Sequence, residues 1–351
     1  MLQLLESPAT IRVRLDKIAS ATATLPLDHS SDLGTTIPSE GGTVLVVEAL
    51  EEKSNYGELE LVGGRMARII KGDLIAGVLG ERQALRGFVG VIPPHIAPGD
   101  VLHMLNMGGV LGRCVSANPD LGKPLRVRVV GVVLHEGIPA NIRQGAIPWQ
   151  SSLPTSAPLI VVSGTCMNSG KTTVACELLR LLSARGYRLA GAKVAGVATR
   201  RDLYNMLDHG AISGLTFSDA GLPSTVQNLD AVVPAAKGIL AALNADAPDA
   251  IMVEFGDGIM GRYGVDLLLR DAEIMGHTRA HILCANDLVG AWGGLRYLGD
   301  MGLTVDCVAG PSTDNSAGSE YIEQRFGVPA ANARTDPAQL ARLIEKKVFA
   351  V

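Results

Sequence analysis

Hydrophobic residues in the first part of the chain follow a short, strand-like pattern. Residues 11–15 alternate between apolar and charged side chains, and short apolar runs follow at residues 43–47, 74–79, 88–92 and 125–133. Gly-Asp, Gly-Gly and Pro-Pro pairs separate these runs, and long helical periodicity is missing. Such alternation, interrupted by turn residues, is typical of β-strands. We therefore predict a β-rich domain, a barrel or a sandwich, over residues 1–140.

The pattern changes after a stretch that is rich in Pro, Gly and Ser, and we predict a linker there over residues 141–157. Continuous apolar runs then indicate buried strands at 159–162, 189–194, 250–254, 280–285 and 303–309. Helical patterns at 171–185 and 288–301 lie between them. Alternation of strands and helices predicts a parallel sheet with helices on both faces. We expect a doubly wound α/β domain over residues 158–351.

A phosphate-binding motif follows the first of these strands. The chain reads Ser-Gly-Thr-Cys-Met-Asn-Ser-Gly-Lys-Thr-Thr over residues 163–173, where a helix is expected to begin. A strand, a glycine-containing loop, Gly-Lys-Thr and a helix are the context of a P-loop, whose backbone N–H groups bind phosphates. Lys171 is placed to reach the β- and γ-phosphates, and the Thr172 hydroxyl to bind Mg²⁺. The predicted nucleotide-binding residues are Gly164, Thr165, Asn168, Ser169, Gly170, Lys171, Thr172 and Thr173.

The spacing of this loop differs from the usual P-loop, because five residues rather than four separate Gly164 from Gly170. In this respect the sequence resembles the dethiobiotin-synthetase-like branch of P-loop proteins, whose loop reads G-T-D-T-x-V-G-K-T. The similarity extends over residues 158–335, although Cys166, Met167 and Ser169 depart from the family pattern. Lys193 matches a lysine on the family's second strand, and Glu254 matches its Mg²⁺-binding carboxylate.

The resemblance implies an ATP- and Mg²⁺-dependent enzyme. Such an enzyme activates a small carboxylate, or a carbamate made from CO₂, as a phosphoryl derivative that an amine then attacks. Lys171 and Lys193 would neutralise charge on the transferring phosphoryl group as the catalytic residues. The family's residues around the second-strand lysine are missing, so a different substrate is expected. The adenine-reading Asn of the family is replaced near Gly310 and Pro311, which leaves GTP open as an alternative to ATP.

Further charged residues follow the predicted strands, where ligands bind in open α/β sheets. Arg200, Arg201 and Asp257 are candidates for substrate binding, and Asp202 and Asp219 are candidates for metal binding beside Thr172 and Glu254. Each has a structural alternative. The stretch 200–202 is equally typical of a solvated helix start, and Asp219 of a turn.

The pairing of a β-rich domain with this P-loop domain is also similar, more weakly, to a bacterial family that includes a D-glutamate N-acetyltransferase. That likeness implies an acyltransferase that uses the P-loop for a phosphate-bearing cofactor such as CoA. A nucleotide-switched GTPase or ATPase that acts on a partner is a further alternative. Its marks would be a guanine-reading N-K-x-D motif or a Cys/His metal pair, and the sequence has neither.

Composition narrows the classes of partner. The formal net charge of −4 and the aromatic content of 4% do not favour nucleic acid or an anionic membrane surface. The five cysteines have no zinc-like spacing, and residues 1–20 lack the pattern of a signal peptide. We expect a cytoplasmic protein with a small-molecule substrate. The apolar residues within 200–225 predict a homodimer, or a higher homo-oligomer, with this segment in the interface.

Overall fold

The computed structural model describes residues 11–349, which divide into two compact units. The β-rich unit contains the described residues through Ala146 together with Val197–Arg200 and Gly221–Gln227. The α/β unit contains Ile147–Gly196, Arg201–Ala220 and residues 228–349. The units therefore separate inside the segment where the sequence predicts a linker. The hydrophobic pattern does not mark the two short segments of the second half that belong to the β-rich unit. Of the stretch 1–20 weighed as a signal peptide, the first ten residues lie outside the described part.

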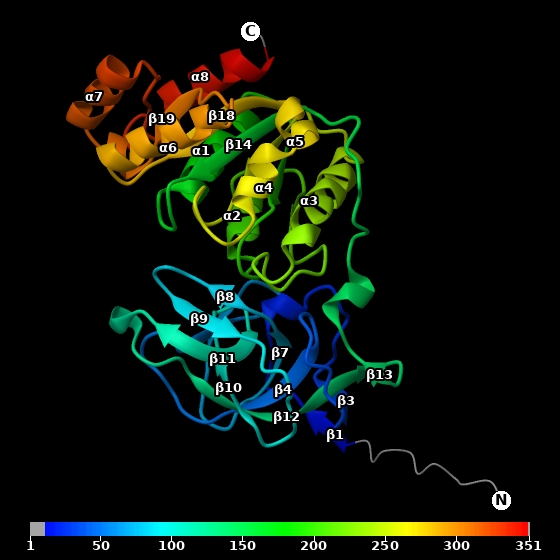
Figure 1. The fold of residues 1–351 in the computed structure, drawn as a ribbon. Coiled ribbons are helices and arrows are strands. Elements are labelled where there is room, and N and C mark those ends of the chain that lie inside the picture. Colours follow the sequence, from blue (N-terminus) through cyan, green and yellow to red (C-terminus); the bar gives the residue numbers. More distant parts are fainter. Residues whose placement is uncertain (1–10, 350–351) are drawn as a thin grey trace, which may run out of the picture. The chain divides into compact units, whose positions relative to one another are not determined.

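The β-rich unit is built on a mixed sheet, part of which closes into a barrel (Figure 1). The strand β12 pairs with β4, β4 with β7, β7 with β11, β11 with β10, and β10 again with β12. The strands of the unit are β1 (Ile11–Arg14), β2 (Lys17–Ile18), β3 (Ser30–Gly34), β4 (Val44–Ala49), β5 (Glu58–Glu60), β6 (Met66–Arg68), β7 (Leu74–Leu79), β8 (Arg82–Gln83), β9 (Phe88–Val91), β10 (Val101–Met104), β11 (Val110–Ala117), β12 (Arg126–His135) and β13 (Ile138–Pro139). Short 3₁₀ turns occur at η1 (Ser20–Thr22), η2 (Pro119–Leu121) and η3 (Ile142–Gly145).

Alternation along β12 shows why these residues form a barrel wall. Val127 and Val129 point into the core, whereas Arg126 and Arg128 point outward. Arg128 pairs there with Glu48 on the neighbouring strand, at 3.1 Å between nitrogen and oxygen. One face of this part of β12 thus buries apolar surface while the other carries charge, as expected for a strand with a period of two.

The α/β unit contains a six-stranded sheet in the order β16–β15–β17–β14–β18–β19, and all its pairings are parallel. The strands are β14 (Leu159–Gly164), β15 (Leu189–Lys193), β16 (Gly214–Thr216), β17 (Ala250–Glu254), β18 (Thr278–Cys284) and β19 (Cys307–Ala309). The helices are α1 (Lys171–Ala184), α2 (Arg201–Asp208), α3 (Leu229–Asn244), α4 (Val265–Arg270), α5 (Ala272–His277), α6 (Leu288–Asp300), α7 (Ser316–Phe326) and α8 (Pro337–Phe349), with a 3₁₀ turn η4 at Pro311–Thr313. The predicted fold class is confirmed: a β-rich unit precedes a doubly wound parallel α/β unit.

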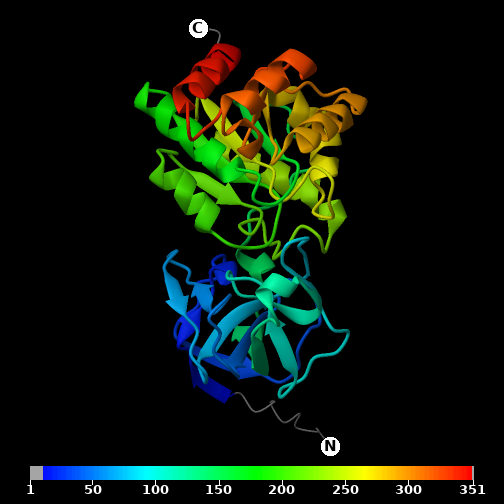
Figure 2. The ribbon, with the colours of Figure 1, turned by 90° about the vertical axis from the view of Figure 1, so that its left-hand side faces the viewer.

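Helices cover both faces of this sheet (Figures 1 and 2). On one face, α1 and α8 pack on Ile160, Met252 and Ile282 within one apolar core. On the other face, Gly294 of α6 lies against Leu283, and an added Cβ there would be 2.8 Å from that side chain. The central strand β14 is buried along its whole length, so the loop that follows it starts from a rigid edge.

The last predicted strand is shorter than expected. Of residues 303–309, only Cys307–Ala309 pair as β19. The preceding residues end α6 instead, because Gly302 has φ of +76° and the Leu303 N–H bonds to the Leu298 carbonyl at 3.0 Å. This glycine-based helix end uses an apolar residue that a hydrophobic run alone assigns to the strand.

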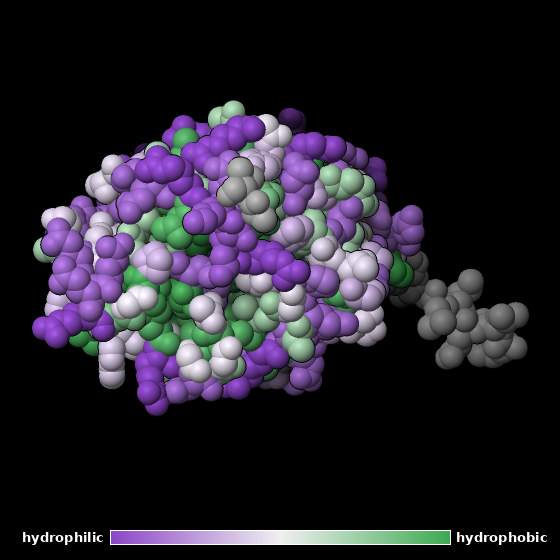
Figure 3. Space-filling view, turned by 90° about the horizontal axis from the view of Figure 1, so that it is seen from above, coloured by the Kyte–Doolittle hydropathy of each residue, from purple (hydrophilic) through white to green (hydrophobic). Residues whose placement is uncertain are grey.

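Within residues 11–349, no helix is both long and apolar enough to cross a membrane. In a space-filling view of one face, hydrophobic residues form separate patches among hydrophilic ones (Figure 3). Large apolar side chains that are exposed include Val289 and Trp292 of α6.

Candidate nucleotide-binding site

The loop between β14 and α1 is held in a tight turn by two residues with left-handed backbone. Asn168 has φ of +62°, and Gly170 has φ of +92° at the N-cap of α1. The first helical hydrogen bond runs from Val174 N to Gly170 O at 3.0 Å. The N–H groups of the first helical turn before Val174 have no partner within the helix by geometry, and they lie at the positive end of its dipole. This end of α1 can therefore bind an anion.

Close packing explains why glycine occupies two positions around this loop. A Cβ on Gly164 would lie 2.3 Å from the Ser169 Oγ, and a Cβ on Gly310 would lie 2.3 Å from the Ser169 carbonyl oxygen. Both distances are far below contact, so side chains there would push the loop out of shape. Ser169 itself is fully buried, and its hydroxyl has no hydrogen-bond partner.

Lys171 is the first residue of α1 and is buried, with 6% of its surface exposed. Its ammonium donates a hydrogen bond to the Cys166 carbonyl of the loop at 2.9 Å. Burial lowers the pKa of Lys171, and the carboxylate of Glu254 only partly opposes this shift. A buried ammonium that bonds to a carbonyl is stabilised further by an anion, and a phosphate group supplies one.

Glu254 ends the apolar strand β17 and is 1% exposed. Its Oε1 accepts a hydrogen bond from the Thr172 hydroxyl at 3.2 Å, whereas its buried Oε2 has no hydrogen-bond partner. Burial raises the pKa of this carboxyl above its usual range. An orphaned carboxylate oxygen beside a threonine hydroxyl fits Mg²⁺, which typically binds through one or two protein oxygens and keeps several waters. A group of three or more acidic, His or Cys ligands does not occur among residues 11–349.

Lys193 lies beside Glu254, because β15 and β17 pair in a register that places the two residues opposite each other. The Lys193 ammonium forms an ion pair with Asp202 of α2 and lies 3.6 Å from Glu254 Oε1. Burial alone would lower the pKa of Lys193, but the two carboxylates raise it above its usual range. For the Asp202 carboxyl, burial alone would raise the pKa, but the Lys193 ammonium lowers it below its usual range. Asp202, a candidate metal ligand from the sequence, is thus engaged by Lys193.

Asp257 has a strained backbone, with φ of +66°. It follows Gly256, where an added Cβ would lie 2.0 Å from the Ala195 carbonyl oxygen. A non-glycine residue in left-handed conformation is uncommon, and such residues cluster at ligand sites. Asp257 therefore has a backbone conformation that is unusual for its residue type, directly after a closely packed glycine.

These residues line one cavity of about 320 Å³ in the α/β unit. Its lining contains Met167, Asn168, Gly170, Lys171, Thr172, Thr173, Lys193, Asp202, Glu254 and Asp257. The sequence predicts every one of these residues except Met167 as part of the site. Their positions come from the ends of β14, β15 and β17, which is the edge where open parallel sheets bind ligands.

A second cavity, of about 200 Å³, shares Asn168, Gly170 and Thr173 with the first. Its other lining residues are Val174, Gly310, Pro311, Asp314, Asn332, Ala333 and Arg334. Asn332 is buried, and its amide donates to Thr313 Oγ1 at 3.0 Å and to Asp314 Oδ1 at 2.9 Å. The resemblance places the base-reading position of the family near Gly310 and Pro311, but the sequence does not indicate 332–334, because no motif surrounds these residues.

Other predicted site residues do not line either cavity. The Asp219 carboxylate accepts a hydrogen bond from Thr216 N at 2.7 Å, which is the turn role weighed against metal binding. Arg201 begins α2, and Arg200 belongs to the β-rich unit. Gly164, Thr165 and Ser169 shape the loop and are not among the lining residues.

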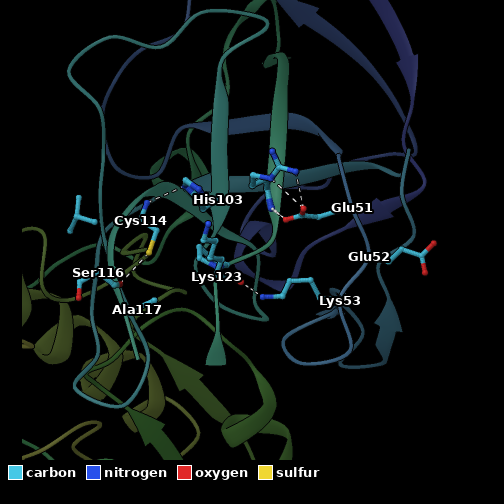
Figure 4. A pocket seen from close by; sticks show the side chains of 11 residues that line it. Glu51, Glu52, Lys53, His103, Cys114, Ser116, Ala117 and Lys123 are labelled. Carbon is cyan, nitrogen blue, oxygen red and sulfur yellow. Dashed lines mark hydrogen bonds and ion pairs between the residues drawn. The ribbon is translucent and has the colours of Figure 1, made fainter. Parts of the chain in front are cut away.

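The β-rich unit has a separate cavity of about 690 Å³ (Figure 4). Its charged groups largely satisfy one another, since Arg126 pairs with Glu51 at 3.0 Å and the Lys53 ammonium bonds to the Lys123 carbonyl. Burial lowers the pKa of His103 and raises that of Cys114, so burial disfavours the charged form of both groups. This cavity has no phosphate-binding loop, and we place the candidate site in the α/β unit.

The segment predicted to form a homo-oligomer interface is partly buried within the α/β unit. Leu203, Met206 and Phe217 are buried in the described structure, with at most 1% of their surface exposed. Ile212 is exposed at 42%. Buried side chains do not reach a partner, so the predicted interface would use other residues of this segment, such as Ile212. The homo-oligomer itself stays a prediction.

Comparisons with known proteins are distant. No protein-family model matches the chain, and no curated protein matches it. Among solved structures, chloroplast FtsY from Physcomitrella patens is 14% identical with a TM-score of 0.36, over 51% of this chain and 59% of that one. FtsY from Elizabethkingia anophelis in complex with GDP is 13% identical with a TM-score of 0.35, over 52% of this chain and 58% of that one. A DUF1611 family protein from Anabaena variabilis is 14% identical with a TM-score of 0.38, over 60% of this chain and 64% of that one.

The chain thus spans about three fifths of the length of these FtsY structures. At such scores the matches say nothing of ligand or reaction. The strand order, the loop after β14 and the helix that follows it decide the fold. The α/β unit resembles a P-loop domain in its parallel sheet, in the loop after β14 and in the helix that follows this loop.

Proposed function

We propose that this protein is a Mg²⁺- and nucleotide-dependent enzyme that transfers a phosphoryl group to a small carboxylate or carbamate, with ATP as the expected donor. The observation that supports this most is the pair of buried ammonium groups in one cavity. Lys171 and Lys193 both line it together with Glu254, beside the N-terminus of α1. The two ammonium groups and the helix N-terminus supply positive charge beside the carboxylates of Asp202, Glu254 and Asp257 in the same cavity, and positive groups stabilise the charge that develops during phosphoryl transfer.

The reaction is balanced by one bond formed and one broken. A carboxylate oxygen of the acceptor bonds to the γ-phosphorus of ATP. The bond between this phosphorus and the oxygen that bridges the β- and γ-phosphates breaks, and ADP leaves with that electron pair. Lys171 and the loop N–H groups hold the phosphates, and Lys193 stabilises charge on the transferring group. Thr172 and Glu254 would hold Mg²⁺, which neutralises phosphate charge when bound. Asp257, which lines the same cavity, would orient the acceptor.

ADP formation measured with small carboxylates, or with bicarbonate and an amine, tests this function. We expect an acceptor to stimulate turnover. Lys193→Met should lower kcat by roughly a hundredfold or more, as when an oxyanion-binding group is removed, while the nucleotide Kd changes by less than about threefold. An enzyme that binds nucleotide but consumes none with any acceptor, and that binds CoA, would contradict the proposal and support acyl transfer.

A further inference from the structure

Within the α/β unit, two neighbouring strands hold the start of the phosphate loop. The strands β17 and β18 lie on either side of β14 in the sheet. After β17, the Ile259 N–H donates a hydrogen bond to the Gly164 carbonyl at 2.8 Å. At the end of β18, the Cys284 carbonyl accepts a hydrogen bond from the Thr165 N–H at 2.9 Å. The backbone at the start of the loop is therefore fixed from both sides.

Cys166 is the next residue of the loop, and it is contacted at its carbonyl, its Cα and its sulfur. The carbonyl accepts the hydrogen bond from the Lys171 ammonium at 2.9 Å. The loop after β17 packs on its Cα, since a Cβ added to Gly258 would lie 3.2 Å from that atom. The Sγ accepts a hydrogen bond from the Asn286 amide at 3.1 Å. Because Asn286 follows β18, this last contact joins the loop to the end of the neighbouring strand.

The start of α6 does not explain why residue 286 is an asparagine. The cap of this helix is the next residue, Asp287, whose carboxylate accepts a hydrogen bond from the Gly290 N–H at 2.7 Å. The Asn286 Oδ1 is buried and has no hydrogen-bond partner. A buried carbonyl oxygen without a partner is costly, so an apolar side chain would fill this space at less cost. The bond to the Cys166 sulfur is what such a side chain could not supply.

We propose that Asn286 is a positioning residue of the phosphate loop. Its amide holds the Cys166 side chain, and this fixes the backbone whose carbonyl receives the Lys171 ammonium. Cys166 departs from the dethiobiotin-synthetase-like pattern, so the resemblance does not imply this pairing. The consequence for nucleotide affinity rests on the proposed function, whereas the claim that Asn286 orders the loop does not.

Hydrogen exchange of the full chain without nucleotide tests whether Asn286 orders the loop. Mass spectrometry gives exchange rates for the loop, residues 165–170, and for β14, residues 159–164, as the internal reference. In Asn286→Ala and in Cys166→Ala, we expect the loop rate to rise about fivefold or more relative to β14, because each change removes one end of the same hydrogen bond. The double variant should differ from either single one by less than about twofold, because one bond cannot be lost twice.

Asp287→Ala is the matched control, one residue further along the chain. It removes the cap of α6 but leaves the bond between Asn286 and Cys166, so the ratio of loop to β14 rates should stay at the wild-type value. Unchanged ratios in both Asn286→Ala and Cys166→Ala would overturn the proposal. Equal rises in the loop and in β14 would also overturn it, because they indicate general unfolding. Additive effects in the double variant would show that Asn286 does not act through Cys166.

Nucleotide affinity is measured on the same variants by calorimetry with Mg²⁺–ATP and with Mg²⁺–GTP. We expect Asn286→Ala to raise the Kd about fivefold or more, because a freed loop must be ordered when the phosphates bind, and Asp287→Ala to change it by less than about twofold. A wild-type Kd in Asn286→Ala, with the loop freed, would contradict the positioning role. If the wild-type protein binds neither nucleotide, the proposed function fails, but the exchange ratios still decide whether Asn286 orders the loop.

Discussion

The α/β unit contains two buried lysines, Lys237 and Lys193, and each lies beside two carboxylates. The two clusters differ in how completely their polar groups are hydrogen-bonded, and this difference distinguishes a structural cluster from a candidate site. Lys237 of α3 lies 2.8 Å from Asp271 and 2.6 Å from Glu273. Asp271 also caps α5, and Glu273 also accepts a hydrogen bond from Leu153 N at 2.9 Å. These carboxylates are therefore bound to main-chain N–H groups as well as to the ammonium. The cluster ties helices and a connecting segment together.

The Lys193 cluster is less complete. Its Glu254 has a buried oxygen without a hydrogen-bond partner, and its three charged groups line a cavity next to a helix N-terminus. A buried ion pair is by itself weak support for function, since such pairs also occur in cores. What distinguishes this cluster is an unsatisfied group at the sheet edge where ligands bind.

Replacing each lysine by methionine gives the largest expected difference. Lys237→Met leaves two carboxylates without their cation and should lower the free energy of unfolding. Lys193→Met should also destabilise, but millimolar Mg²⁺ should restore part of its loss, because the ion replaces the missing positive charge near Glu254. Chemical denaturation with and without Mg²⁺ measures both. If Mg²⁺ changes the stability of the two variants equally, the Lys193 cluster does not bind Mg²⁺ any more than the Lys237 cluster does.

A third buried group extends the comparison to pH. His281 of β18 is 2% exposed, and its Nε2 lies 2.8 Å from the Ser163 hydroxyl. Burial lowers the pKa of His281 to about 4. This folded pKa is below the unfolded value of about 6.5. The contribution of neutral His281 to the free energy of unfolding is therefore fully present above about pH 6.5 and is lost as pH falls towards 4. The loss should be of the order of 2–3 kcal/mol.

The His281 contribution is measured by chemical denaturation between pH 7 and 4. We expect the slope of unfolding free energy against pH to be shallower in His281→Asn than in the wild type in this range, since the asparagine does not titrate. Parallel slopes would show that another group causes the acid sensitivity, and would remove His281 from the account.

Glu254 gives a smaller effect that bears directly on the site. Glu254→Gln should keep nucleotide binding but lose most of its Mg²⁺ dependence, a change of roughly tenfold in the ratio of affinities with and without Mg²⁺. The matched control is Glu273→Gln, which alters a carboxylate of the structural cluster and should respond to Mg²⁺ as the wild type does. If both variants respond alike, Glu254 has a structural role only.

Local signals in the sequence predict the sheet edge well, for a physical reason. A buried strand, a Gly-Lys-Thr loop and an amphipathic helix are each defined by residues that are close in the sequence. Short patterns therefore predict β14 and α1, and they also predict that Lys171, Lys193 and Glu254 line the cavity. The same holds for β7, whose bounds, Leu74–Leu79, match the apolar run at 74–79.

What the sequence does not predict depends on long-range contacts. Asn332 acquires its place through bonds to residues that are 18 and 19 positions away, and Glu60 meets Arg200 across 140 positions. Asp202 was assigned to metal from its place after a strand, and only the folded structure shows Lys193 as its partner. Residues 197–200 and 221–227 belong to the β-rich unit for the same reason, because no local pattern records which core a connecting segment joins.

The central claim, that residues 164–173 bind the phosphates of a nucleotide, is tested most directly by calorimetry of Lys171→Ala. The lysine is buried against the loop and donates to the Cys166 carbonyl at 2.9 Å, so its removal takes away the cation nearest the bound phosphates. We predict that the variant keeps the wild-type circular dichroism spectrum and binds Mg²⁺–ATP, or Mg²⁺–GTP if that is the ligand, at least about tenfold more weakly. A folded variant with the wild-type affinity would contradict the assignment of the site.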